Sequence, residues 1–107
     1  MVDRAYVDKF SRALNALCVS EGGVRERLKL AYPHLRRVFL KSVPEPYQDE
    51  LESILAAMTA KGPSAEKFPD GKPLRDALEN TFFGMRNATA KKLAERVYRM
   101  TTGALGF

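Results

Sequence analysis

"VRERLKLAYPHLRRVFLK", residues 24–41, decides the predicted fold, because its apolar residues keep a helical spacing on both sides of a proline. At 3.6 residues per turn, one face of this helix would carry Val24, Leu28, Ala31, Leu35, Val38 and Phe39. Pro33 falls on the opposite side, where water can satisfy the carbonyl that a proline leaves unpaired. The stretch predicts one helix kinked at Pro33. The competing interpretation is two short helices, with Pro33 at the first position of the second.

Helical periodicity also dominates the rest of the chain, and no segment shows the two-residue alternation of a strand. The predicted helices span residues 3–20, 24–41, 45–60, 74–83 and 88–101. The chain of 107 residues therefore predicts an all-α fold, a small bundle of four to five helices in a single domain, residues 1–107. Residues 61–73 would form a loop, and residues 102–107 a frayed tail.

The expected core follows the apolar lines of these helices. Outside residues 24–41, those lines contain Tyr6, Phe10, Ala13, Leu14, Leu17, Tyr47, Leu51, Ile54, Leu55, Met58, Leu74, Ala77, Leu78, Thr81, Phe82, Leu93, Val97 and Met100. Cys18 is the only cysteine, so no intrachain disulfide is possible, and we expect it to be buried as a small hydrophobe. Asp3 is expected to cap the first helix, and Asn87 or Thr89 the last.

The net charge of +5 is unevenly distributed along the chain. Residues 24–41 hold six basic side chains and one acidic one, and residues 81–107 hold five basic and one acidic. Between them, residues 42–60 hold four acidic side chains and no basic one. Such a pattern can bind an external anion, or the acidic helix can neutralise its basic neighbours within the fold. We favour neutralisation within the fold.

The sequence carries few of the groups that enzymes use. His34 is the only histidine, which excludes a multi-histidine metal site and leaves no second imidazole for proton transfer. We expect it to be a surface or half-buried side chain. The acidic residues Asp49 and Glu52 lie one helical turn apart, but they fit a solvated helix face better than a cation site. We therefore predict no enzymatic activity, no catalytic residue, no cofactor and no metal.

Three large apolar side chains point away from the predicted core: Leu30, Leu40 and Phe83. They indicate a second packed surface, which another helix of the bundle or a second subunit could cover. The favoured function is thus a non-enzymatic protein-interaction or oligomerisation module, whose partner is a protein or a second copy. The N-terminus shows no apolar signal segment and no stretch is long enough to span a bilayer, so we expect a cytoplasmic protein without a membrane partner.

The alternative is a nucleic-acid-binding accessory protein that uses the basic helices 24–41 and 88–101. Its candidate surface consists of Arg25, Lys29, Arg36, Arg37, Lys92, Arg96 and Arg99. The last three form one row, but the cations of residues 24–41 fall on two flanks of the apolar face. A helix-turn-helix that begins in the last helix would lack a recognition helix, because only "TTGALGF" follows it. A second register, with 74–83 supporting and 88–100 reading DNA, stays open.

Three stretches together resemble a known family: "RERLKLAYPHL" (25–35), "VPEPYQDELESILAAMT" (43–59) and "MRNATAKKLAERVYRM" (85–100). The series is similar to a family of small, uncharacterised, all-helical bacterial proteins. In these, an "RERL..A" motif precedes a proline-led acidic helix, a loop and an "LAE+I" helix. The resemblance spans about residues 24–100 and implies a helical fold without supplying an activity or site residues. This chain departs from the pattern in its extra basic charge at 36–41 and in lacking an acidic cap before Ala90.

Overall fold

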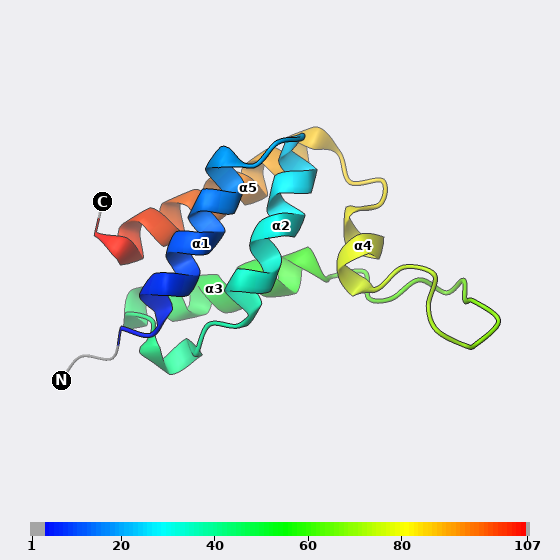
Figure 1. The fold of residues 1–107 in the computed structure, drawn as a ribbon, viewed down its shortest axis with the longest axis horizontal. Coiled ribbons are helices and arrows are strands. Elements are labelled where there is room, and N and C mark those ends of the chain that lie inside the picture. The colour runs from blue at the N-terminus through cyan, green and yellow to red at the C-terminus, as the bar shows by residue number, and fades with distance from the viewer. Residues whose placement is uncertain (1–3, 107) are drawn as a thin grey trace.

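The computed structural model describes residues 4–106 and confirms the all-α fold (Figure 1). Five α-helices and one short 3-10 helix follow one another along these residues, and an isolated bridge between Lys67 and Pro73 is the only extended pairing that they contain. The elements are α1 (Tyr6–Val19), α2 (Val24–Arg36), η1 (Leu40–Ser42), α3 (Glu45–Met58), α4 (Ala77–Phe82) and α5 (Asn87–Leu105).

Helix α2 runs through Pro33 without a break, which excludes the two-helix interpretation. Pro33 is exposed, while Leu28, Ala31 and Leu35 are completely buried, so the apolar face keeps its phase past the proline. This face packs against α1, which runs back along α2 as the other arm of a helical hairpin (Figure 1). The reversal needs Gly22, whose φ of 102° lies in the left-handed region that glycine adopts without strain.

The predicted extent of this helix to residue 41 is wrong. Helix α2 ends at Arg36, and the chain is extended at Phe39 before the 3-10 turn of η1. Because the helical spacing stops, Phe39 does not reach the core and its side chain is 60% exposed. Val38 still packs against the core from the connecting segment.

Helices α3 and α5 cover the other side of the α1–α2 hairpin (Figure 1). Pro44 and Pro46 flank the first residue of α3, where their missing N–H groups cost nothing. Of the expected apolar line, Leu51, Ile54 and Met58 are fully buried. Helix α5 contributes a longer line, formed by Ala90, Leu93, Val97, Met100 and Ala104.

The frayed tail is also a wrong prediction, because α5 continues to Leu105. Ala104 lies one turn beyond Met100 and extends the buried line, and its carbonyl accepts a hydrogen bond from Tyr6 Oη at 3.2 Å. The helix ends at Gly106, whose left-handed backbone closes it. This hydrogen bond joins the first turn of α1 to the last turn of α5, which are far apart in the sequence.

The predicted helix caps differ from the structure. Asn87 and Thr89 do not cap α5, which begins at Asn87 with Arg86 at the N-cap position and no side-chain cap bond. The cap predicted at Asp3 lies outside the described residues, and Ala5 holds the N-cap position of α1. The one side-chain cap that the described helices show is Asp76, which accepts from the Glu79 amide at 2.8 Å.

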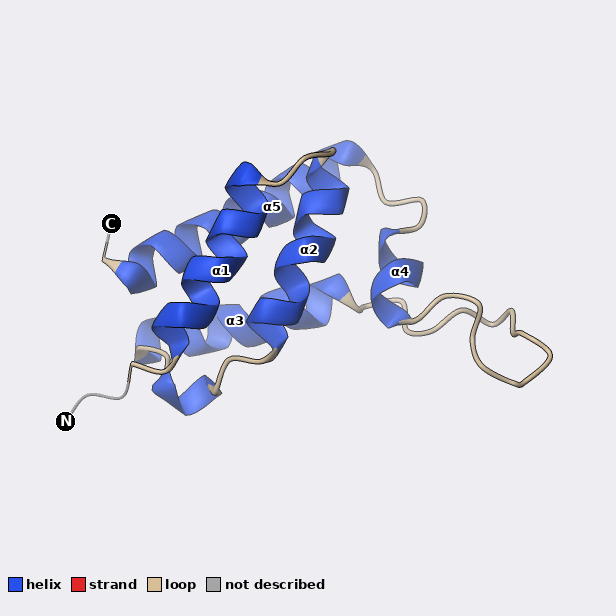
Figure 2. Ribbon diagram, viewed as in Figure 1, coloured by secondary structure: helices blue, strands red, loops and turns tan. Residues whose placement is uncertain are grey.

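Helix α4 begins at Ala77 and not at residue 74, so the core position predicted for Leu74 is wrong. Leu74 belongs instead to an arm, residues 62–76, that projects from the helical body (Figure 2). The Leu74 amide donates to the Glu66 carbonyl at 2.8 Å, and Phe68 donates to Lys72 at 2.8 Å. Gly71, with φ of 89°, forms the turn between them. The arm is thus a hydrogen-bonded hairpin that exposes Phe68 and Leu74.

Close packing of α3 on α5 gives a test of the fold. A Cβ atom added at Gly103 would lie 2.7 Å from Tyr47 Oη and 3.0 Å from two ring carbons. We expect Gly103→Ala to lower the free energy of unfolding by about 1–3 kcal/mol, because the ring must move. In a Tyr47→Ala background the same change should raise it by up to about 1 kcal/mol, because alanine favours helix. Urea unfolding of the wild type, the two single variants and the double variant measures both effects. If Gly103→Ala changed the free energy of unfolding in the same direction in both backgrounds, the result would contradict this packing.

Candidate functional site

Three of the seven candidate basic side chains, Arg25, Lys29 and Arg96, form contacts within the fold. Arg25 Nη1 donates to the Met85 carbonyl at 2.9 Å, which fastens the segment between α4 and α5 to the start of α2. Arg96 of α5 binds α3: its Nε donates to Glu50 at 3.0 Å and its Nη2 to Ser53 Oγ at 2.8 Å. The acidic helix α3 therefore neutralises a cation of α5, as expected for charges satisfied inside the fold.

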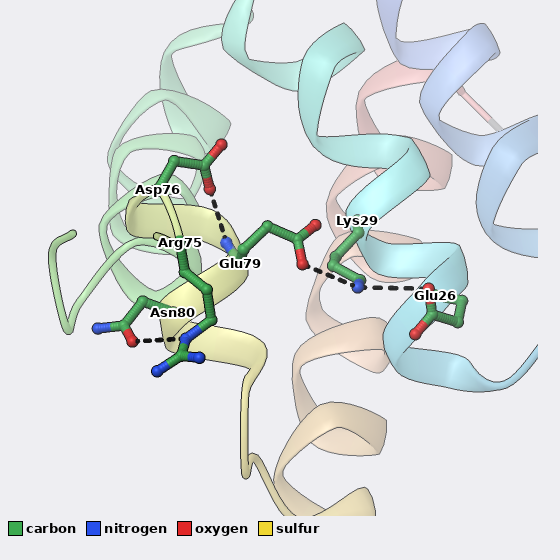
Figure 3. Close-up of polar contacts among 6 residues, drawn as sticks. All are labelled: Glu26, Lys29, Arg75, Asp76, Glu79 and Asn80. Carbon is green, nitrogen blue, oxygen red and sulfur yellow. Dashed lines mark hydrogen bonds and ion pairs between the residues drawn. The ribbon is translucent and has the colours of Figure 1, made fainter. Parts of the chain in front are cut away.

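Lys29 holds α4 against α2. Its ammonium lies 3.3 Å from Glu26 on its own helix and 3.4 Å from Glu79 on α4 (Figure 3). At the base of the arm, Arg75 donates to Asn80 at 3.3 Å, and its guanidinium lies 4.0 Å from the centre of the Phe83 ring. These contacts fix α4 and the arm from both sides.

The other four candidate cations are exposed and form no ion pair within residues 4–106: Arg36, Arg37, Lys92 and Arg99. They do not gather on one surface. Arg36 and Arg37 lie at the C-terminal end of α2, whereas Arg99 lines a hollow together with Arg27, near the start of α2. Arg36 lies nine positions after Arg27 in the helix, which corresponds to about 14 Å along its axis.

Of the three candidate oligomer contacts, Leu30 and Phe83 are exposed as predicted, and Leu40 is not. Leu30 and Phe83 are 51% and 62% exposed, as expected for side chains that point away from the core. Both border the junction of α2 and α4, where hollows contain Leu30 with Glu79 and Phe83 with Lys29. Leu40 does not point outward: it is half-buried and packs against the core, because the 3-10 turn redirects it.

Sequence reasoning missed a groove between α1 and α5. Cys18, expected to be buried, is exposed on its wall. Val19 and Tyr98 stand beside it with 69% and 51% of their surface exposed. Two hollows of about 490 and 650 Å³ adjoin here, because Cys18 and Tyr98 line both of them, and we refer to the two together as the α1–α5 groove.

The two ends of this groove differ in chemistry. Toward the C-terminal end of α5 its walls are apolar or uncharged, and Leu14 and Leu105 contribute to them. Toward the start of α5 the wall contains three cations, Arg27, Lys91 and Arg99, against one carboxylate, Glu95. An apolar trough with a basic end is the clearest surface feature that the packing of these helices creates.

A sequence signal for the groove exists in α1. Phe10, Ala13 and Leu17 form the buried line, and Leu14 and Cys18 form a second line beside it. Two adjacent apolar lines make a wider face than one neighbouring helix covers. Tyr98, however, lies one residue from the buried Val97, and only the packing of α5 on α1 shows that its ring faces the groove.

Comparisons with known protein families, with curated proteins and with solved structures give no match. Over residues 4–106, no group of three or more histidine, cysteine, aspartate or glutamate side chains is arranged to hold a metal ion. None of the helices in this part of the chain combines the length and the apolar character that crossing a membrane requires.

The structural role of Arg25 can be tested by stability. We expect Arg25→Ala to lower the free energy of unfolding by about 1–3 kcal/mol, because the partly buried Met85 carbonyl loses a charged donor. Arg36→Ala removes the same charge from an exposed position of the same helix and should change it by less than about 0.5 kcal/mol. Equal losses in urea unfolding would show that Arg25 acts through net charge alone.

Proposed function

We propose that this protein is a non-enzymatic protein-interaction module that binds its partner through the α1–α5 groove. The observation that carries the proposal is that Val19 and Tyr98, two large apolar side chains, are both exposed and both line one hollow. The apolar lines of α1 and α5 are already buried against each other and against α2. Val19 and Tyr98 are therefore not part of the core, and binding a partner would remove them from water.

Self-association is a second form of the same proposal. Leu30 and Phe83 remain exposed next to the α2–α4 junction and supply apolar surface for a symmetric contact. Leu40 no longer supports it, because its side chain packs inward. The Lys29–Glu79 pair lies between α2 and α4 at this junction, so a second copy would have to pack around a charged centre. The groove is the better-supported surface.

Binding of nucleic acid is the competing proposal. A phosphate backbone needs several free cations along one path. Arg25, Lys29 and Arg96 are engaged within the fold. The remaining candidates lie at separate places on the surface, and α4, with six residues, is short for the supporting helix of a helix-turn-helix. These observations favour a protein partner.

The groove proposal is tested by photo-crosslinking in cells that express the protein. With p-benzoylphenylalanine at Tyr98 we expect one discrete crosslinked protein, and with the same group at Glu52, exposed on α3, none. The purified partner should bind the unmodified protein, and Tyr98→Gln should weaken that binding at least about tenfold, because an aromatic anchor is lost. No product at Tyr98, or equal products at both positions, contradicts the proposal.

The nucleic-acid alternative is tested by a salt series with duplex and single-stranded DNA. We expect dissociation constants weaker than about 10⁻⁴ M at physiological salt, because Arg36 and Arg37 lie away from the cations of α5 and too few free cations follow one path. Fluorescence anisotropy measures this directly. An affinity of about 10⁻⁶ M that falls steeply with salt, and that Lys92→Ser with Arg99→Ser abolishes, would establish the alternative.

A further inference from the structure

We infer that the α1–α5 groove is built for one class of partner: an amphipathic helix with acidic residues toward one end. The inference rests on the proposed function and goes beyond it by stating the partner's shape and charge. It depends on three features of the groove, namely its length, its apolar wall and its basic end.

The length and openness of the groove suit a helix. From Lys91 to Leu105 the groove follows 15 residues of α5, and the 14 helical steps between them correspond to about 21 Å. A partner helix of about 14 residues, or four turns, matches this distance. Both hollows are open to solvent, so a small molecule would stay largely exposed, whereas a helix would bury one face and keep the other in water.

The apolar wall defines the partner's buried face. Leu14, Val19, Tyr98 and Leu105 line the uncharged part of the groove, and Cys18 lies where this part adjoins the basic end. An amphipathic helix presents apolar side chains at positions i, i+3 or i+4, and i+7, and this row can enter such a trough. The exposed Tyr98 ring is suited to be the main anchor, because aromatic side chains contribute most of the binding energy in many interfaces.

The basic end defines the partner's charge. Arg27, Lys91 and Arg99 outnumber Glu95 there, and a carboxylate in this half of the groove would meet an excess of positive charge. Arg27 is held at this end of the groove, because its Nη1 donates to the Leu17 carbonyl at 3.4 Å. Within residues 4–106 it forms no ion pair, so a carboxylate of a partner would meet a positioned positive charge that the fold does not neutralise.

A second copy of the chain does not supply such a helix. The outward face of α3 is acidic, with Glu45, Asp49 and Glu52 exposed, but its large apolar side chains point into the core. Helices α1, α2 and α5 expose some apolar side chains, such as Val19, Leu30 and Tyr98, but each of these helices contains more basic than acidic residues. Within residues 4–106, no helix of 12 or more residues combines an acidic surface with a free row of large apolar side chains. The fitting occupant is therefore a helix of another protein.

The test is selection from a displayed library of 14-residue peptides, with leucine fixed at i, i+3, i+7 and i+10 and the other positions randomised. We expect the enriched peptides to carry acidic residues toward one end. Their binding, measured by fluorescence anisotropy, should weaken at least about tenfold with Tyr98→Gln. Lys91→Glu with Arg99→Glu should weaken it about tenfold or more, and this loss should shrink as salt rises.

Matched variants and distinct outcomes separate the inference from the proposed function. Arg36→Glu with Arg37→Glu makes the same change in net charge away from the groove and should leave binding within about twofold. Circular dichroism checks that each variant is folded. Enriched peptides that depend on Tyr98 but show no acidic preference would overturn the inference and leave the groove as a protein-binding site. No enrichment, or binding that is indifferent to Tyr98, would overturn both for this groove.

Discussion

The whole structure depends on the burial of one face of α2 against α1, α5 and α3. Leu28, Ala31 and Leu35 are completely buried, and each of the two leucine side chains contributes about 1.5–3 kcal/mol on leaving water. This face stays continuous only because Pro33 lies on the solvent side, where the unpaired carbonyl can be hydrated. Helices α3 and α5 then pack on the hairpin, and the hydrogen bond from Tyr6 to Ala104 ties the last turn of α5 to the first turn of α1.

Charged side chains position the elements that the hydrophobic core holds only weakly. Helix α4 buries only Thr81 and Phe82, and Lys29 and Arg25 attach it and the segment after it to α2. The Arg96–Glu50 pair joins α5 to α3 in the same way. Each exposed ion pair adds little to stability by itself, yet together they specify where short elements sit. The basic character of the sequence is thus partly structural.

Outside these internal contacts, the surface has two regions with exposed apolar side chains, the α1–α5 groove and the arm. The α1–α5 groove joins apolar side chains that the core leaves over with cations that no carboxylate fully neutralises. The arm carries Phe68 and Leu74 on a hydrogen-bonded hairpin away from this groove (Figure 2). A module that recognises another protein needs this kind of surface, in which apolar anchors and a charged end select one orientation of the partner.

The sequence by itself determined the helical class, the order of the helices and most of the core, because apolar spacing of 3.6 residues is a local property. It also placed the break between the first two helices at residues 21–23 and the start of the third helix at residue 45. It erred where local spacing does not decide the outcome. The chain leaves the helix after Arg36, and α5 continues past Met100, because packing on distant segments stabilises those ends.

The sequence identifies the cations, but only the tertiary structure decides which of them form ion pairs within the fold. A pair such as Arg96 and Glu50 joins residues that are far apart in the chain. The groove likewise depends on tertiary structure, because its walls belong to the first, second and last helices.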